Sequence, residues 1–188
     1  MFSAALTDWR TARKGKLDGV DAHCATLAAL VPPPPLAEEA LQGYAMLLGG
    51  DFQGFCRALC TECAQAFAAV LPITLQAIAQ TQFTAGLVLN TGNPVVKNIR
   101  EDFDRFGLRL DLIGADPANA VRITHLGHLN HWRNHVAHQK TTLPPVGVPQ
   151  TLVLADVRDW RASCDGIAAS LDGIMYNHLK AVLGTAPW

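Results

Sequence analysis

Histidine is concentrated in one short segment of this chain. Five of the seven histidines lie within residues 125–138, at positions His125, His128, His131, His135 and His138. At about 100° per residue, a helix would place all five within an arc of roughly 140°, so they would share one broad face. Imidazole exchanges protons near neutral pH and also binds transition metals. This segment is therefore the first candidate for acid–base or metal chemistry.

An arginine and a histidine of this segment form an Arg-x4-His pattern. The motif reads RNHVAH over residues 133–138, so that Arg133 is followed directly by the polar Asn134 and the motif closes on His138. This pattern resembles the HEPN superfamily. The upstream segment 93–99, the FGL triplet at 106–108 and a closing helix over 157–179 look most like the RiboL-PSP branch of that superfamily. The resemblance covers residues 56–183 or thereabouts.

The resemblance implies an endoribonuclease that needs neither a metal nor another cofactor. His138 would act as general base or acid toward a ribose 2′-hydroxyl, and Arg133 would clamp the scissile phosphate and offset charge in the transition state. Asn134 would orient the phosphate through hydrogen bonds. The cleft would form between two copies of the motif in a homodimer. Such enzymes act on RNA as toxins or defence effectors, so an antitoxin is a possible partner.

The same residues have simpler interpretations. Arg133 could be an ordinary surface arginine, and His138 could interact with the last carbonyls of its helix. His131, His135 and Lys140 are candidate RNA contacts, although each histidine could instead pack or cap locally. Trp132 could stack on a base, but a packing role is more common for a tryptophan beside an interface helix.

Two other functions use the same segment. The leading alternative is a non-catalytic HEPN module that binds or regulates a partner such as a nucleotidyltransferase. A third is a metal-binding helix, because His131 and His135 are four residues apart and His128 lies one turn earlier. No Asp or Glu occurs between Asp116 and Asp156, so such a site would need three imidazoles or distant ligands.

Two further motifs favour structure over chemistry. The spacing Cys56-x3-Cys60-x2-Cys63 occurs in iron–sulfur enzymes, but on an Ala-rich helix it predicts a buried stripe. The glycines at 49, 50 and 54 lack the Lys-Ser/Thr ending of a phosphate-binding loop.

Proline and glycine divide the chain into helical segments, and no convincing strand pattern is present. We expect helices over residues 6–30, 37–48 and 52–71, the last capped by Asp51 and followed by further turns to residue 83, then a loop over 87–93. Asn93-Pro94 and Asp116-Pro117 are typical helix starts, and the second would open a central helix over 117–139. After a proline-rich loop, a final helix would span 155–183. The prediction is an all-α, HEPN-like bundle of four to five main helices, with the central and last helices antiparallel.

Composition limits the remaining possibilities. The chain has 188 residues, of which 49% are hydrophobic, and a net charge of −1, which excludes a uniformly basic nucleic-acid binder. We expect one domain over 1–188, with residues 1–50 a helical extension of unassigned role and 51–183 the core. Early charges and the lack of a long apolar run argue against a signal peptide or membrane span, and the five cysteines suit a reducing compartment. We therefore expect a cytoplasmic protein.

Overall fold

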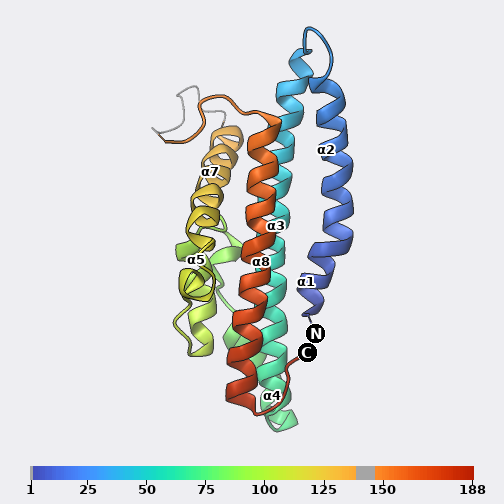
Figure 1. Cartoon of the computed structure of the whole chain (residues 1–188). Helices are drawn as coiled ribbons and strands as arrows, with labels where there is room; N and C mark the ends of the chain where they lie inside the picture. The colour runs from blue at the N-terminus through green and yellow to red at the C-terminus, as the bar shows by residue number, and fades with distance from the viewer. Residues whose placement is uncertain (1, 139–146) are drawn as a thin grey trace.

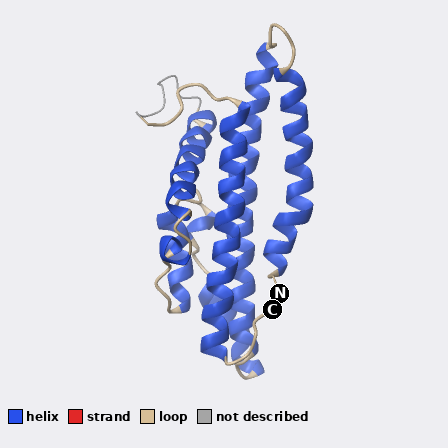
Figure 2. Ribbon diagram, viewed as in Figure 1, coloured by secondary structure: helices blue, strands red, loops and turns tan. Residues whose placement is uncertain are grey.

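The computed structural model describes residues 2–138 and 147–188, and within these ranges it contains helices and no strand (Figure 2). The predicted all-α helical bundle is confirmed. Lys140, one of the candidate RNA contacts, lies outside the described residues, as do the predicted end of the central helix and part of the proline-rich loop. Figure 1 shows the axes of the longer helices α2, α3, α7 and α8 to be roughly aligned.

The N-terminal segment is close to one continuous helix. It consists of α1 (Ala4–Asp8), a π-helical turn η1 (Trp9–Arg13) and α2 (Lys14–Ala28), where the sequence predicted residues 6–30. Ser3 begins it, because the Ser3 Oγ accepts a hydrogen bond of 3.0 Å from the Leu6 amide. Trp9 fixes it to the bundle, with its ring centroid 5.8 Å from that of Phe52 and 5.9 Å from that of Phe55.

Helix α3 (Pro35–Ala69) is a single element of 35 residues. The predicted division into helices 37–48 and 52–71 is wrong, and Asp51 is not a helix cap. Its carboxylate instead accepts a hydrogen bond of 3.2 Å from Lys16 Nζ of α2. A glycine inside a helix costs about 1 kcal/mol, whereas each buried Leu or Phe contributes about 1.5–3 kcal/mol. The fully buried Leu48 and Phe52 on either side of the glycines therefore keep the helix intact.

Short elements connect α3 to the second half of the bundle. They are α4 (Ile73–Thr84), η2 (Val88–Asn90), α5 (Val96–Phe103), η3 (Asp104–Phe106) and α6 (Leu112–Ala115). The two predicted helix starts lie slightly too early, because α5 begins at Val96 and α7 at Asn119. Asp116 closes a local turn by accepting a hydrogen bond of 3.0 Å from the Ala118 amide. The side chain of Asn93 caps no helix and instead donates a hydrogen bond to Asn134 of α7.

Helices α7 (Asn119–Ala137) and α8 (Leu154–Leu183) pack against each other and against α3. Figure 1 shows their chain directions to be opposite, which confirms the predicted antiparallel pair. Leu126 and Leu129 of α7 and Leu171 of α8 are buried in the shared core. These contacts hold α7 along the side of α3 and so position the Arg133 segment.

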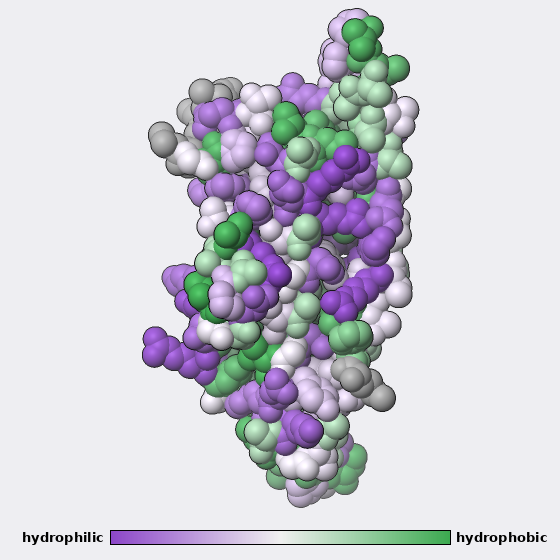
Figure 3. Space-filling model, in the orientation of Figure 1, coloured by the Kyte–Doolittle hydropathy of each residue, from purple (hydrophilic) through white to green (hydrophobic). Residues whose placement is uncertain are grey.

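The predicted cysteine stripe is confirmed, because Cys56, Cys60 and Cys63 are fully buried along α3. Burial raises the pKa of the Cys60 thiol to about 12. The surface is mixed, and hydrophilic side chains gather over the seam between α8 and α2 (Figure 3). Among the described residues, no helix is both long enough and apolar enough to cross a membrane.

Candidate functional site

Arg133 lies on α7 and its side chain crosses to α3. A Cβ atom placed on Gly49 would stand 3.0 Å from the Arg133 Cδ, which is tighter than nine in ten such contacts. Gly49 is buried and helical, so it has no conformational need to be glycine. Its missing side chain makes room for the aliphatic part of Arg133.

Gln53, one turn along α3 from Gly49, holds the guanidinium. Arg133 Nη1 donates a hydrogen bond of 2.8 Å to Gln53 Oε1. The amide nitrogen of Gln53 donates in turn to the carbonyl oxygens of Leu89 at 2.6 Å and Gly92 at 3.0 Å. Since two carbonyl acceptors fix the amide nitrogen, the oxygen is the atom left for the arginine. Gln53 therefore orients Arg133 and fastens the 89–92 segment to α3.

The charge of Arg133 is not neutralised by any carboxylate in the described part of the chain. Its side chain is partly buried, and this loss of solvent lowers the pKa of the guanidinium, with burial as the only cause. An arginine still carries its proton at neutral pH. A cation that is partly removed from water, and whose one partner among the described residues is a neutral amide, retains a strong attraction for an anion.

Asn134 is joined to the same loop region. Its Oδ1 accepts a hydrogen bond of 2.6 Å from Asn93 Nδ2, and the carbonyl oxygen of Asn93 accepts one of 2.8 Å from Asn98 Nδ2. The side-chain nitrogen of Asn134, Nδ2, has no hydrogen-bond partner among residues 2–138 and 147–188. It is therefore free to donate to a ligand. Arg133 and Asn134 thus meet an amide-rich wall formed by Gln53 and Asn93.

His138 is the first residue after α7 and is exposed. Its backbone amide donates a hydrogen bond of 3.1 Å to the carbonyl oxygen of Asn134. It lies five positions after Arg133, which corresponds to about 140° around the helix axis. Within the described ranges, no hydrogen bond or ion pair joins the side chains of Arg133 and His138. The two side chains therefore leave the end of α7 in different directions.

The other residues of this segment have varied environments. Trp132 is buried and its Nε1 donates to the Pro149 carbonyl oxygen at 3.1 Å, so the predicted packing role is confirmed. The ring of His135 lies 5.3 Å from that of Trp132, and His131 is exposed. His125 Nδ1 lies 2.8 Å from the Ser163 hydroxyl of α8.

The metal interpretation needs His128 together with other ligands. Burial and the neighbouring His125 and His131 lower the pKa of His128, which keeps its imidazole neutral. In the part of the chain that the structure describes, no group of three or more His, Cys, Asp or Glu side chains is placed to hold an ion.

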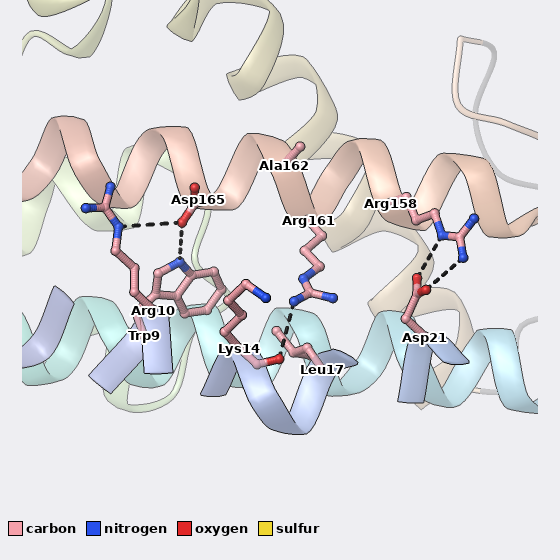
Figure 4. A pocket seen from close by; sticks show the side chains of 9 residues that line it. All are labelled: Trp9, Arg10, Lys14, Leu17, Asp21, Arg158, Arg161, Ala162 and Asp165. Atoms are coloured by element: carbon pink, nitrogen blue, oxygen red, sulfur yellow. Dashed lines mark hydrogen bonds and ion pairs between the residues drawn. The ribbon is translucent and has the colours of Figure 1, made fainter. Parts of the chain in front are cut away.

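A cavity of about 680 Å³ lies elsewhere, between α2 and α8. Figure 4 shows charged side chains from both helices meeting across it. Arg158 binds Asp21 through two hydrogen bonds of 2.9 and 2.7 Å, and Arg161 binds Asp18. Because these guanidinium groups already have carboxylate partners, the cavity is an ion-paired seam between helices and has little unsatisfied charge to offer a ligand.

No family model matches this chain, and no curated protein or solved structure is significantly similar to it. The site is therefore defined by its own geometry. That geometry includes Gly49 and Gln53, which the sequence interpretation did not select. Their signal is a glycine in the middle of an apolar helical pattern followed one turn later by a polar residue, and the partner on α7 becomes visible only in the fold.

Proposed function

We propose that this chain is a HEPN-type endoribonuclease that acts as a homodimer and requires no metal. The observation that carries the proposal is the partly buried Arg133, which is held by Gln53 and has no carboxylate partner in the described chain. A fixed, unneutralised guanidinium suits a phosphodiester. The Arg-x4-His motif resembles that of HEPN proteins, and this resemblance supports RNA as the substrate and a role as a toxin or defence effector.

In the proposed reaction, His138 removes the proton from a ribose 2′-hydroxyl. The resulting oxygen attacks the adjacent phosphorus, and the bond from phosphorus to the 5′-oxygen of the next nucleotide breaks. The leaving oxygen takes up a proton from water, and His138 later returns its own proton to water, so the products are a 2′,3′-cyclic phosphate and a 5′-hydroxyl. Arg133 and the free amide nitrogen of Asn134 stabilise negative charge on the phosphoryl oxygens.

The test is incubation of the purified full chain with end-labelled total RNA in EDTA. Wild type is compared with Arg133→Ala and His138→Ala, and the termini of the products are determined. We expect cleavage with cyclic phosphates from wild type only, with at least a hundredfold loss in each variant. Removing one charge-stabilising donor such as Arg133 typically costs about 10²–10³ in rate, and removing a general base such as His138 costs about 10²–10⁴. Arg109→Ala, an exposed cation outside the site, serves as the control and should retain activity.

Equal cleavage by wild type and both variants would contradict the assignment of these residues. Absence of cleavage by wild type on total RNA would contradict the enzyme proposal and favour the non-catalytic module. That alternative predicts a stable complex with a second protein, such as a nucleotidyltransferase or an antitoxin, which co-purification and mass spectrometry would identify.

A further inference from the structure

A second, smaller cavity lies next to Gln53. It has a volume of about 380 Å³ and is formed by α3 together with the end of α4 and the η2 turn. Its polar lining residues are Arg57 and Thr61 of α3, Thr84 of α4 and Asn90 of η2. No Asp or Glu is among its lining residues.

This cavity offers both free hydrogen-bond donors and free acceptors. Arg57 is exposed, and neither its guanidinium nor the side-chain amide of Asn90 has a partner within residues 2–138 and 147–188. These two groups supply free donors. The hydroxyl protons of Thr61 and Thr84 are already donated to the carbonyl oxygens of Arg57 and Gln80, at 3.0 and 2.7 Å. The threonine oxygens therefore act only as acceptors in the cavity.

The positive charge of Arg57, which is unpaired among the described residues, distinguishes this cavity from the larger one between α2 and α8. In the larger cavity each arginine or lysine lies within ion-pair distance of an aspartate. An anion entering there would have to displace a carboxylate. An anion entering beside Arg57 would meet a free cation, which makes the smaller cavity the better anion site.

Gln53 connects the smaller cavity with the Arg133 site through its hydrogen bonds. Gln53 bonds both to Arg133 and to the carbonyl oxygen of Leu89, and Asn90 is the next residue of the same turn. Arg57 is four residues beyond Gln53 on α3, which is about 6 Å along the helix axis. Arg133, held by Gln53, and Arg57 therefore lie along the same part of α3, where one nucleotide strand can reach both.

We propose that this cavity is a ribonucleotide subsite for single-stranded RNA, beside the scissile phosphate. Arg57 and Asn90 donate to a phosphodiester oxygen, while the Thr61 and Thr84 oxygens accept from a ribose 2′-hydroxyl, which DNA lacks. This inference rests on the proposed function for the identity of the substrate. Its groups act in binding and take no part in bond breaking.

Binding is measured in the full chain carrying His138→Ala, which separates affinity from cleavage. The probe is a fluorescently labelled single-stranded RNA oligonucleotide, compared with DNA of the same sequence, by anisotropy over a range of salt. We expect Arg57→Ala to weaken RNA binding about tenfold and to reduce the salt slope by about 0.7, as for one lost phosphate contact on a single strand. Thr61→Val should weaken RNA binding but leave DNA binding unchanged.

Arg109→Ala in the same background is the matched control and should bind RNA as its parent does. Unchanged affinity and salt slope in Arg57→Ala would overturn the subsite, as would a parent protein that does not bind RNA. Selective loss at Arg57 in a protein whose wild type does not cleave would support the subsite while contradicting the nuclease proposal. Normal RNA binding by Arg57→Ala, together with cleavage by the wild type, would overturn the subsite and support the nuclease proposal.

Discussion

At the scale of single residues, the contact between Gly49 and Arg133 links stability to the candidate site. We expect Gly49→Ala to gain little or no stability in wild type, because the new methyl group pushes against the Arg133 Cδ at 3.0 Å. In the Arg133→Ala background that atom is gone, and the same change should stabilise by about 1 kcal/mol through helix propensity. Urea unfolding of the four proteins in a double-mutant cycle measures the difference.

Gly50 is the matched control for this cycle. It is exposed in the same helix, and a Cβ built there meets no atom within 4 Å. Gly50→Ala should therefore stabilise by about 0.5–1 kcal/mol in both backgrounds. Equal gains from Gly49→Ala in the two backgrounds would show that the Arg133 side chain does not rest on Gly49 in solution.

Asp172 makes stability depend on pH in an unusual direction. Burial raises the pKa of this carboxyl, although its Oδ1 accepts a hydrogen bond of 3.1 Å from the Ser3 amide. Because the folded protein then holds this proton more tightly than the unfolded chain, its contribution to stability falls as pH rises from the unfolded pKa through the folded one. Asp172→Asn keeps an oxygen acceptor for Ser3 and removes the charge. We expect it to stabilise relative to wild type more at pH 7 than at pH 4.

Asp18 provides the opposite case. Hydrogen bonds from Lys14 and Arg161 lower the pKa of this exposed carboxyl. Its contribution is present above the unfolded pKa and is lost as pH falls through the folded one. Asp18→Asn should therefore be more unfavourable at pH 7 than at pH 3, as measured by urea unfolding at both values. The same pH trend in both variants would refute the role assigned to Asp172.

At the scale of elements, the N-terminal helices are held by apolar packing more than by ion pairs. Trp9 is 3% exposed and packs on two phenylalanines, so Trp9→Ala should destabilise by about 3–5 kcal/mol. Arg158 is half exposed in its pair with Asp21, and Arg158→Ala should cause a far smaller loss that disappears in high salt. Thermal unfolding at low and high salt compares them. A larger effect of Arg158 would contradict this view.

The elements were largely predictable because apolar periodicity and proline positions are local signals. Helices α7 and α8 match the predicted 117–139 and 155–183 within a few residues. The failure at Gly49 and Gly50 has a definite cause. Two adjacent glycines are a strong local stop signal, and they are overridden only by the packing of residues from α7 and the core. That packing is a tertiary property which one segment of sequence does not contain.

The candidate site was predictable only in part. The motif residues Arg133, Asn134 and His138 are visible in the sequence as a cluster of functional types. Their supports, Gln53 and Asn93, are 80 and 41 residues away in the chain, and no local pattern connects them with the motif. A local motif thus identifies the candidate groups, whereas the residues that orient them emerge only from the fold.

At the scale of the whole molecule, the separation of Arg133 from His138 makes assembly part of the proposed mechanism. If each cleft combines Arg133 of one copy with His138 of the other, a dimer of Arg133→Ala with His138→Ala contains one intact pair. We expect the co-expressed mixed dimer, isolated with two different tags, to recover a substantial share of RNA cleavage. Each variant alone serves as the inactive control. Lack of recovery in a purified mixed dimer would place both groups in the same copy.

The five buried cysteines can report the order in which parts of the bundle unfold. Cys24 belongs to α2, Cys56, Cys60 and Cys63 to α3, and Cys164 to α8, and all are free thiols without solvent access. An alkylating reagent reaches a sulfur only when the helix around it detaches, since the thiolate is the reactive form and burial suppresses it. The order in which the five sites acquire label, followed by peptide mass spectrometry, would therefore record which layer of the bundle separates first.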